Sequence, residues 1–111
     1  MGGIVSINIF SGRESPRWEV DKRIIASAVE MWQKFNSHNE FGSQLPVLGY
    51  RGIELTFDKE EWLVYKKYIR RKSKNRIEYR YDEDRVTEHL LLETCPSGLL
   101  STEILKAIRE N

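Results

Sequence analysis

The chain has 111 residues, of which 40% are hydrophobic, 11% aromatic and 32% charged, and its formal net charge is +1. This length and apolar content suffice for one domain with its own core, and they exclude a disordered chain. The near-neutral total excludes the strong overall positive field that is typical of nucleic-acid-binding domains. With one cysteine, no disulfide framework forms within the chain, and the Cys and His spacing matches no structural zinc motif. We therefore expect one domain over residues 1–111, without a metal or cofactor.

The N-terminal segment lacks the basic start and long apolar stretch of a signal peptide, and no run approaches the ~20 apolar residues of a membrane span. We expect a cytoplasmic protein that makes no membrane contact. Gly2 followed by Ser6 matches the short pattern for N-myristoylation. We favour the alternative, a glycine-rich extension that leads into a strand.

The first half of the chain predicts two extended segments and a helix. Residues 4–10 are dense in Ile and Val and predict a mostly buried strand, which Ser11-Gly12 ends. Pro16 keeps the residue before it out of the helical region, so we expect residues 15–20 to be extended. Asp21 is a typical N-cap, and an apolar stripe at spacings of three and four follows it as far as Phe35. The stripe predicts a helix of about four turns that ends at the polar residues 36–39.

The middle of the chain predicts strands. Apolar and polar residues alternate strictly over residues 53–57, which is typical of a strand with one solvated face. For residues 62–71 the spacing fits either a helix or a strand. We favour a hairpin in which 62–71 pairs with 76–81 across the turn-like cluster 72–75.

Two helices are expected at the C-terminal end. The acidic residues 82–84 suit the positive end of a helix whose apolar side is Val86 and residues 90–92. Ser101 or Thr102 can cap a last helix. The expected order is β-α-β-β-β-α-α, and sequential strands usually lie side by side. The sequence thus predicts an α+β fold with one mostly antiparallel sheet and helices on one face.

Three blocks of the sequence resemble a family of small single-domain proteins. That family has an IFSGRPNPxW start, a central LGYRG and a D-x-x-R-x-x-E-x-x-L-L helix near the C-terminus. The matching residues here are Phe10-Ser11-Gly12-Arg13 with Pro16 and Trp18, then Leu48-Gly49-Tyr50-Arg51-Gly52, then Asp82 to Arg85 with Glu88, Leu91 and Leu92. Glu14 and Ser15 depart from the pattern, where the family has Pro and Asn. The resemblance implies a single-domain fold and no particular activity.

Candidate catalytic groups are few. His38 lies in a polar loop, and His89 has no second ligand at metal-binding spacing. Cys95 follows a helix C-terminus, where the dipole raises a thiol pKa, so we interpret it as a small, partly buried apolar residue. Asp82 and Asp84 would act as a carboxylate pair only beside a cleft; we favour a solvated helix start. The loop at Gly12 and Arg13 follows a strand but lacks the repeated glycines and lysine of phosphate loops.

Polar residues in the three blocks are candidates for a structural role. Each of the arginines lies beside a turn or a helix start, and a guanidinium can tie two segments together with its fixed donors. We expect each arginine to reach a carboxylate or a backbone carbonyl. The candidate structural residues are Arg13, Arg51, Asp84, Arg85 and Glu88.

The charge is distributed unevenly. Residues 66–80 contain eight basic residues and one acidic residue, so this basic hairpin creates a local field. Tyrosines alternate with the cations and could stack on bases or pack against a partner. The candidate binding surface consists of Lys66, Arg70, Arg71, Lys72, Lys74, Arg76, Tyr68 and Tyr79.

Three interpretations of the hairpin stay open at this point: a solvated edge protected by lysines, a surface for an acidic protein, or a site for single-stranded nucleic acid or RNA. We expect a non-catalytic binding or accessory module that acts through protein contacts. Nucleic-acid binding through residues 66–80 is the alternative, and a small enzyme that uses the Gly12–Arg13 loop is the third. A homo-oligomer is compatible with the sequence.

Overall fold

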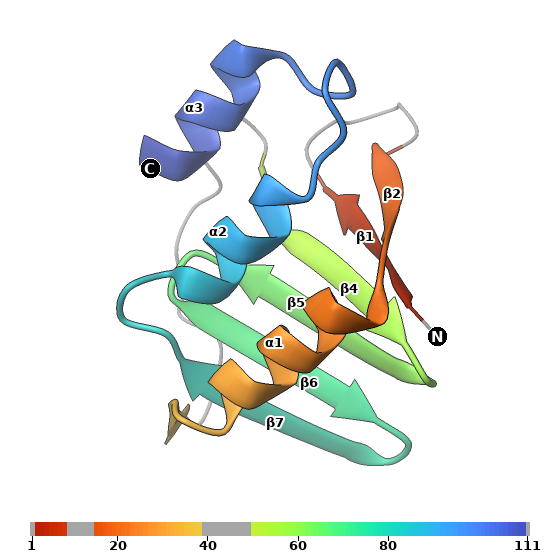
Figure 1. Cartoon of the computed structure of the whole chain (residues 1–111). Helices are drawn as coiled ribbons and strands as arrows, with labels where there is room; N and C mark the ends of the chain where they lie inside the picture. Colours follow the sequence, from red (N-terminus) through yellow and green to blue (C-terminus); the bar gives the residue numbers. More distant parts are fainter. Residues whose placement is uncertain (1, 9–14, 39–49, 111) are drawn as a thin grey trace.

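The computed structural model describes residues 2–8, 15–38 and 50–110 and consists of one antiparallel sheet and three helices (Figure 1). The first elements are β1 (Gly3–Ile7), β2 (Arg17–Val20), α1 (Lys22–Trp32), β3 (Asn36–His38) and β4 (Ile53–Phe57). They are followed by β5 (Glu60–Tyr65), β6 (Tyr68–Ser73), β7 (Arg76–Tyr81), α2 (Val86–Glu93) and α3 (Thr102–Glu110).

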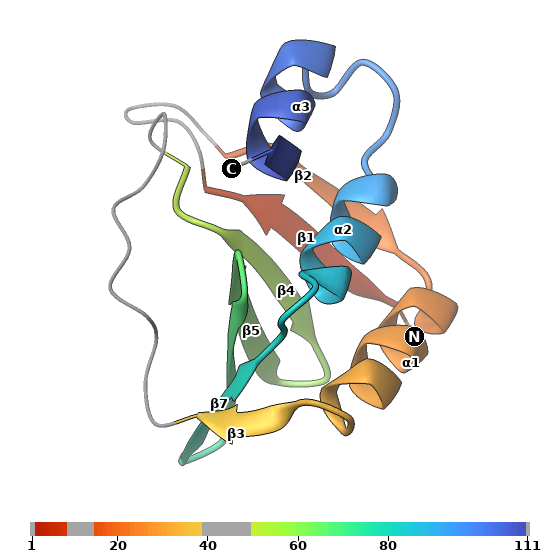
Figure 2. The same cartoon turned by 90° about the vertical axis from the view of Figure 1, so that its left-hand side faces the viewer.

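The seven strands lie in the order β2-β1-β4-β5-β6-β7-β3, and every neighbouring pair is antiparallel. Helices α1 and α2 pack on one face of this sheet, and α3 lies beyond α2 at one end (Figures 1 and 2). The predicted α+β class with one antiparallel sheet is confirmed. The expected order holds once three further strands are added to it, namely β2, β3 and one more strand from residues 60–73.

Alternation along the strands places the core between the sheet and the helices. In β4, Ile53, Leu55 and Phe57 are buried, whereas Glu54 and Thr56 are exposed. The registers to β1 and β5 continue this pattern, because Val5 and Trp62 lie on either side of Leu55. These side chains face the helices, so we call this side the helix face and the opposite side the outer face.

Helix α1 begins and packs as its sequence predicts. The Asp21 carboxylate accepts hydrogen bonds from the backbone amides of Arg23 (2.9 Å) and Ile24 (3.2 Å). The apolar stripe buries Ile25, Ala28 and Trp32 against the sheet. After the helix, the chain adds the edge strand β3, which we expected to be a loop. The three residues of β3 are all polar and exposed, so the sequence has no alternation of apolar and polar residues that would predict a strand paired with β7.

The expected hairpin of 62–71 with 76–81 is wrong in its first half, and the helical alternative is excluded. Residues 60–73 form two strands, because the chain reverses at Lys66, whose φ is 54°. A second reversal at Lys74, with φ 50°, pairs β6 with β7 as predicted. Both positions adopt a left-handed backbone with lysine rather than with the Gly or Asn that would mark a turn in the sequence.

Trp32 is the deepest aromatic side chain of α1, with 2% of its surface exposed and its ring centroid 5.3 Å from that of Trp62. Replacing it by alanine (Trp32→Ala) should lower the free energy of unfolding by about 3–5 kcal/mol, as aromatic truncations in cores do. Chemical denaturation measures this loss. The exposed Glu30 on the same helix is the control: Glu30→Ala should change stability by less than about 0.5 kcal/mol. If Trp32→Ala unfolded at the same denaturant concentration as wild type, the apolar stripe of α1 would not pack against the sheet.

Candidate functional site

A buried carboxylate joins three distant segments of the chain. Glu88, on α2, has no exposed surface. One of its oxygens accepts hydrogen bonds from the Tyr50 hydroxyl (2.6 Å) and from the backbone amide of Lys66 (3.1 Å). Its other oxygen accepts from Arg85 Nε (2.7 Å) and is also paired with the second guanidinium nitrogen. We call Glu88, Arg85, Tyr50 and the Lys66 amide the Glu88 network.

Arg85 extends the network to the last helix. Its guanidinium donates to the carbonyl oxygens of Ile108 (2.8 Å) and Arg109 (3.4 Å), close to the C-terminus of α3. These carbonyls have no partner within a helix, and a cation there also compensates the helix dipole. Arg85 itself precedes α2 in a left-handed conformation with φ 56°. One side chain thus holds α2, Glu88 and α3 together.

The neighbouring Asp82 fixes the start of α2. Its carboxylate, 1% exposed, accepts from the amides of Val86 (3.2 Å) and Thr87 (2.9 Å), and its own amide donates to the Lys67 carbonyl (2.6 Å). The β5–β6 turn is therefore held twice, by the bond of the Lys66 amide to Glu88 on α2 and by the bond of the Lys67 carbonyl to Asp82, which precedes α2. The expected solvated helix start is wrong for Asp82, because its carboxylate is buried and accepts from the first amides of α2, three residues before the N-cap position Arg85.

The geometry of the Glu88 network is structural rather than catalytic. Both carboxylate oxygens are occupied by donors, and the Glu88 side chain has no exposed surface. Burial, with the adjacent Glu88 adding to it, raises the pKa of the Tyr50 hydroxyl far above its usual value. Tyr50 therefore stays protonated and serves as a hydrogen-bond donor.

The other proposed structural residues lie elsewhere. Arg51 is exposed; its backbone amide donates to Asn8 (2.7 Å), and no described residue contacts its side chain through a hydrogen bond. Asp84 is exposed as well, because the cap comes from Asp82, two residues earlier. Arg13 and the Gly12–Arg13 loop lie outside the described residues. Tyr50 belongs to the second block but was not among the candidate structural residues. It lies 38 positions from Glu88, and no local pattern connects the two.

The basic hairpin divides into two groups of cations. Four of them have partners within the fold. Arg71 makes two hydrogen bonds to the Glu60 carboxylate (2.6 and 3.1 Å), Arg76 pairs with Glu78 (2.8 Å), and Lys67 lies 3.8 Å from Glu83. Arg80 donates to the carbonyl oxygens of Trp32 (2.6 Å) and Phe35 (3.4 Å), which ties β7 to the end of α1.

Arg71 belongs to the core side of the sheet. Its guanidinium carbon lies 5.2 Å from the ring centroid of Trp62 and 5.6 Å from that of Trp32, so it packs over both rings beside Glu60. Burial disfavours ionised Glu60, but the hydrogen bonds from Arg71 and Trp62 outweigh it and hold the carboxyl pKa below its usual value. Arg71, which we included in the candidate binding surface, is thus bound to a carboxylate of the fold itself.

The remaining four cations, Lys66, Arg70, Lys72 and Lys74, form no ion pair among the described residues. Arg70 and Lys72 alternate with Arg71 along β6, so they project from the outer face. The buried Arg70 Nε finds no hydrogen-bond partner in the described part of the chain. Lys66 and Lys74 occupy the turns at the two ends of this strand. We call these four residues the β6 cation row.

Aromatic rings border the β6 cation row. Tyr68 and Tyr81 lie on the same face with ring centroids 5.4 Å apart, and the His38 ring is 5.4 Å from Tyr68. Tyr79 is the cross-strand neighbour of Arg70. On the other side of the row, Glu61 lies opposite Lys72. The surface therefore combines cations, aromatic rings and one carboxylate.

The other candidates contribute no chemical site. Burial raises the pKa of the Cys95 thiol, which is half-buried, so the thiolate is disfavoured. His89 Nε2 is buried and has no hydrogen-bond partner in the described part of the chain. Across residues 2–8, 15–38 and 50–110, no group of three His, Cys, Asp or Glu side chains could hold a metal ion. In the same ranges, no helix has the length and apolar character needed to cross a membrane.

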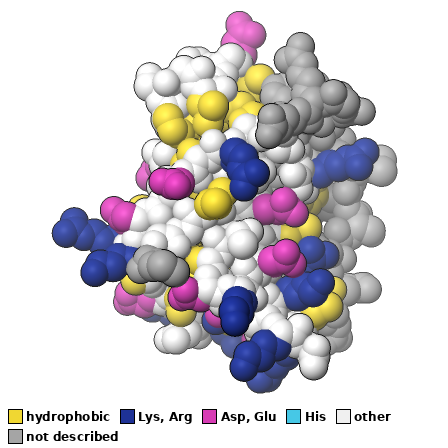
Figure 3. All heavy atoms as spheres, turned by 90° about the vertical axis from the view of Figure 1, so that its right-hand side faces the viewer, with side chains coloured by type: hydrophobic (Ala, Val, Ile, Leu, Met, Phe, Trp, Pro, Cys, Tyr) yellow, Lys and Arg dark blue, Asp and Glu magenta, His cyan; other side chains and the backbone are white. Residues whose placement is uncertain are grey.

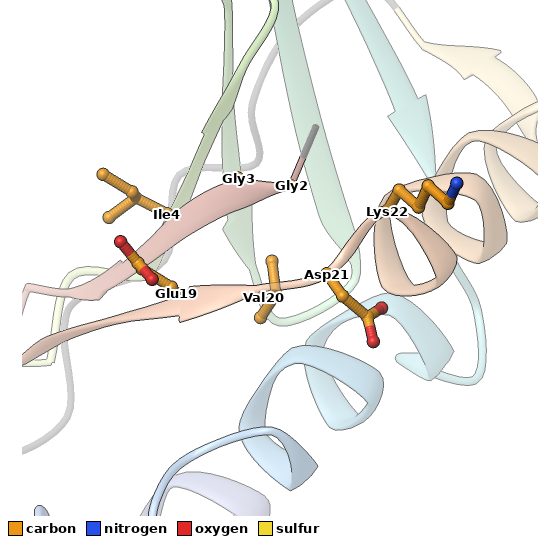
Figure 4. A pocket seen from close by; sticks show the side chains of 7 residues that line it. All are labelled: Gly2, Gly3, Ile4, Glu19, Val20, Asp21 and Lys22. Carbon is orange, nitrogen blue, oxygen red and sulfur yellow. The ribbon is translucent and has the colours of Figure 1, made fainter.

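An open hollow of about 510 Å³ lies where β1, β2 and α1 begin or end (Figure 4). Ile4 and Glu19 are cross-strand neighbours at its rim, and the Asp21 carboxylate is used as the cap of α1. A side chain at Gly2 would come within 2.0 Å of the Val20 carbonyl oxygen, so glycine is required there for close approach of the backbones. The presence of glycine at position 2 is therefore explained by packing, without N-myristoylation.

Comparisons with family models, with curated proteins and with solved structures find no match to this chain. The resemblance described above therefore depends on the residues of its three blocks. In the described part of the chain, Tyr50 of the second block meets Arg85 and Glu88 of the third in one buried network.

Replacing Arg71 by serine (Arg71→Ser) should lower the free energy of unfolding by about 1.5–3 kcal/mol, because it removes charged hydrogen bonds from a half-buried carboxylate. Lys72→Ser, at the exposed and unpaired neighbour, should cost less than about 0.5 kcal/mol. The folded-state pKa of Glu60 is lowered, so the contribution of the pair is complete above the unfolded pKa and disappears as the pH falls through the folded value. Urea titrations at neutral and acidic pH measure the difference in unfolding free energy between wild type and Arg71→Ser. A difference that does not become smaller at acidic pH would contradict this prediction.

Proposed function

We propose that the protein is a non-catalytic binding module that recognises an acidic protein partner through the β6 cation row and the tyrosines beside it. The observation that carries this proposal is the division of the basic hairpin. The fold pairs Arg71, Arg76 and Lys67 with carboxylates and binds Arg80 to backbone carbonyls, whereas the β6 cation row has no ion-pair partner among the described residues. Lys66 Nζ lies 5.6 Å from the Tyr65 ring centroid, but no carboxylate in the described part of the chain compensates any of the four charges. Such cations are available to a partner's carboxylates. A cytoplasmic location stays a prediction.

A protein partner is favoured over RNA by the charges around the row. Glu61 lies opposite Lys72, and Glu54 is exposed on the same face of β4. These carboxylates would repel a continuous phosphate backbone, but a protein surface with mixed charges can accommodate them. Single-stranded RNA is the second candidate, because Tyr68, Tyr79 and Tyr81 lie beside the cations and could stack on bases.

The test compares two triple variants with equal changes in net charge. Arg70→Ser/Lys72→Ser/Lys74→Ser removes most of the row, and Lys22→Ser/Lys34→Ser/Lys106→Ser removes exposed lysines from the helices and their flanks. The probes are a fluorescent peptide with acidic and aromatic residues and a single-stranded oligouridine, measured by anisotropy at two salt concentrations. We expect the row variant to bind the peptide at least tenfold more weakly and the control variant to bind it like wild type.

Thermal unfolding of both variants checks that the fold is intact. The exposed lysines contribute little to stability, and the check matters most for Arg70, whose Nε is buried. Equal loss of peptide binding in the two variants would show that only net charge matters and would contradict a specific surface. Tighter binding of oligouridine, with a steep loss at higher salt, would replace the protein partner by nucleic acid.

A further inference from the structure

Strand β2 ends the sheet on the side opposite to β3, and among the described residues it pairs only with β1. Figure 3 looks at the molecule from this side, where acidic and basic side chains are interspersed over the surface. The outer strand of a sheet presents unpaired N–H and C=O groups and is a template for pairing with another chain. This edge lies far from the β6 cation row, so the inference drawn from it is independent of the proposed function.

The hydrogen-bond pattern identifies the backbone groups that point away from the sheet. The Ile7 amide donates to the Pro16 carbonyl (3.0 Å), which makes these residues a hydrogen-bonded pair. Such pairs alternate along antiparallel strands, so Trp18 and Val20 also direct their backbone groups toward β1. The N–H and C=O groups of Arg17 and Glu19 therefore point outward, and no other described segment forms a hydrogen bond with them.

The side chains of the same two residues carry opposite charges. Arg17 and Glu19 are exposed and share the outer face, because they are two positions apart on a strand. Neither forms an ion pair within the described part of the chain. A positive and a negative residue that flank one central position are complementary to their own copy when the two strands run antiparallel.

We infer that β2 is the contact for a second copy of this chain, in an antiparallel pairing whose twofold axis passes at Trp18. Arg17 of each copy then lies opposite Glu19 of the other. Each such pair can exchange both backbone hydrogen bonds, with the Cα atoms about 5.5 Å apart and the two side chains adjacent on the outer face. The two sheets join into one continuous sheet.

Charge and hydrogen bonding together select this register. A shift that centres the axis on Arg17 places the two arginines opposite each other, and a shift to Glu19 places the two carboxylates opposite each other. If the axis passed between two residues, each outward-pointing backbone group would face a residue of the other copy whose groups point toward β1, and the two could not form a hydrogen bond. Only the axis at Trp18 satisfies the outward groups and both charges of each copy.

The test is a charge exchange followed by sedimentation equilibrium at low salt, with loading concentrations up to about 1 mM. Wild type should dimerise reversibly. Arg17→Glu and Glu19→Arg should each weaken the dimer at least tenfold, because each brings like charges together at both ends of the pairing. Mixing these two single variants should restore association as a 1:1 heterodimer, and the double variant Arg17→Glu/Glu19→Arg should dimerise like wild type. Glu54→Arg, on the outer face of β4, is the matched control and should leave the dimer unchanged.

Circular dichroism establishes whether each variant is folded. If one single variant does not fold, the double variant still tests the inference, because it should dimerise like wild type. A wild type that stays monomeric throughout the concentration range would overturn the inference. So would a mixture of the two single variants that associates no more tightly than either alone, since that result would exclude the register centred on Trp18.

Discussion

Burial of the Glu88 carboxylate imposes the strictest constraint on this structure. A charged group with no access to water is stable only when charged and polar donors surround it. Here the donors come from Arg85, from the Tyr50 hydroxyl and from the Lys66 amide, and they belong to three segments of the chain. The β5–β6 turn, the approach to β4 and the start of α2 must therefore take the positions that the carboxylate requires, and Arg85 transmits the constraint to α3.

A second constraint is the alternation of side chains along β6 and β7. It sends Arg71 and Arg80 to the helix face, where they pack over tryptophan rings and bind Glu60 and the end of α1. It sends Arg70 and Lys72 to the outer face, where neither is ion-paired among the described residues. A continuous run of positive charge in the sequence thus becomes two sets of residues, one structural and one available for binding. The proposed function rests on the second set.

The sequence predicted the elements whose signals are local. Asp21 and the apolar stripe identified α1, and alternation from Ile53 to Phe57 identified β4. The division of residues 60–73 into two strands was missed because Lys66 makes the turn without a glycine or asparagine. Its left-handed backbone is stabilised by the hydrogen bond from its amide to Glu88, a partner 22 positions away.

The candidate site was predictable only in part, for the same reason. Arg85 and Glu88 stand three positions apart on one helix turn, and the sequence pointed to both. Tyr50 was not identified, because only the folded chain brings its hydroxyl to Glu88. Asp82 was seen as one of three acidic residues, and its role as the cap depends on the path of the chain after β7. The pairing of Arg71 with Glu60 likewise depends on the β5–β6 register.

The most direct measurement of the central claim is the unfolding free energy of Glu88→Gln, with Glu83→Gln as the control. The amide keeps the size of the side chain but removes the charge that compensates Arg85, so we expect a loss of about 3–5 kcal/mol. The exposed Glu83 interacts with Lys67 and Tyr81 at the surface, and its replacement should change stability by less than about 0.5 kcal/mol. A Glu88→Gln variant as stable as the control would contradict the account, because the segments around Glu88 would then be held in place by packing alone.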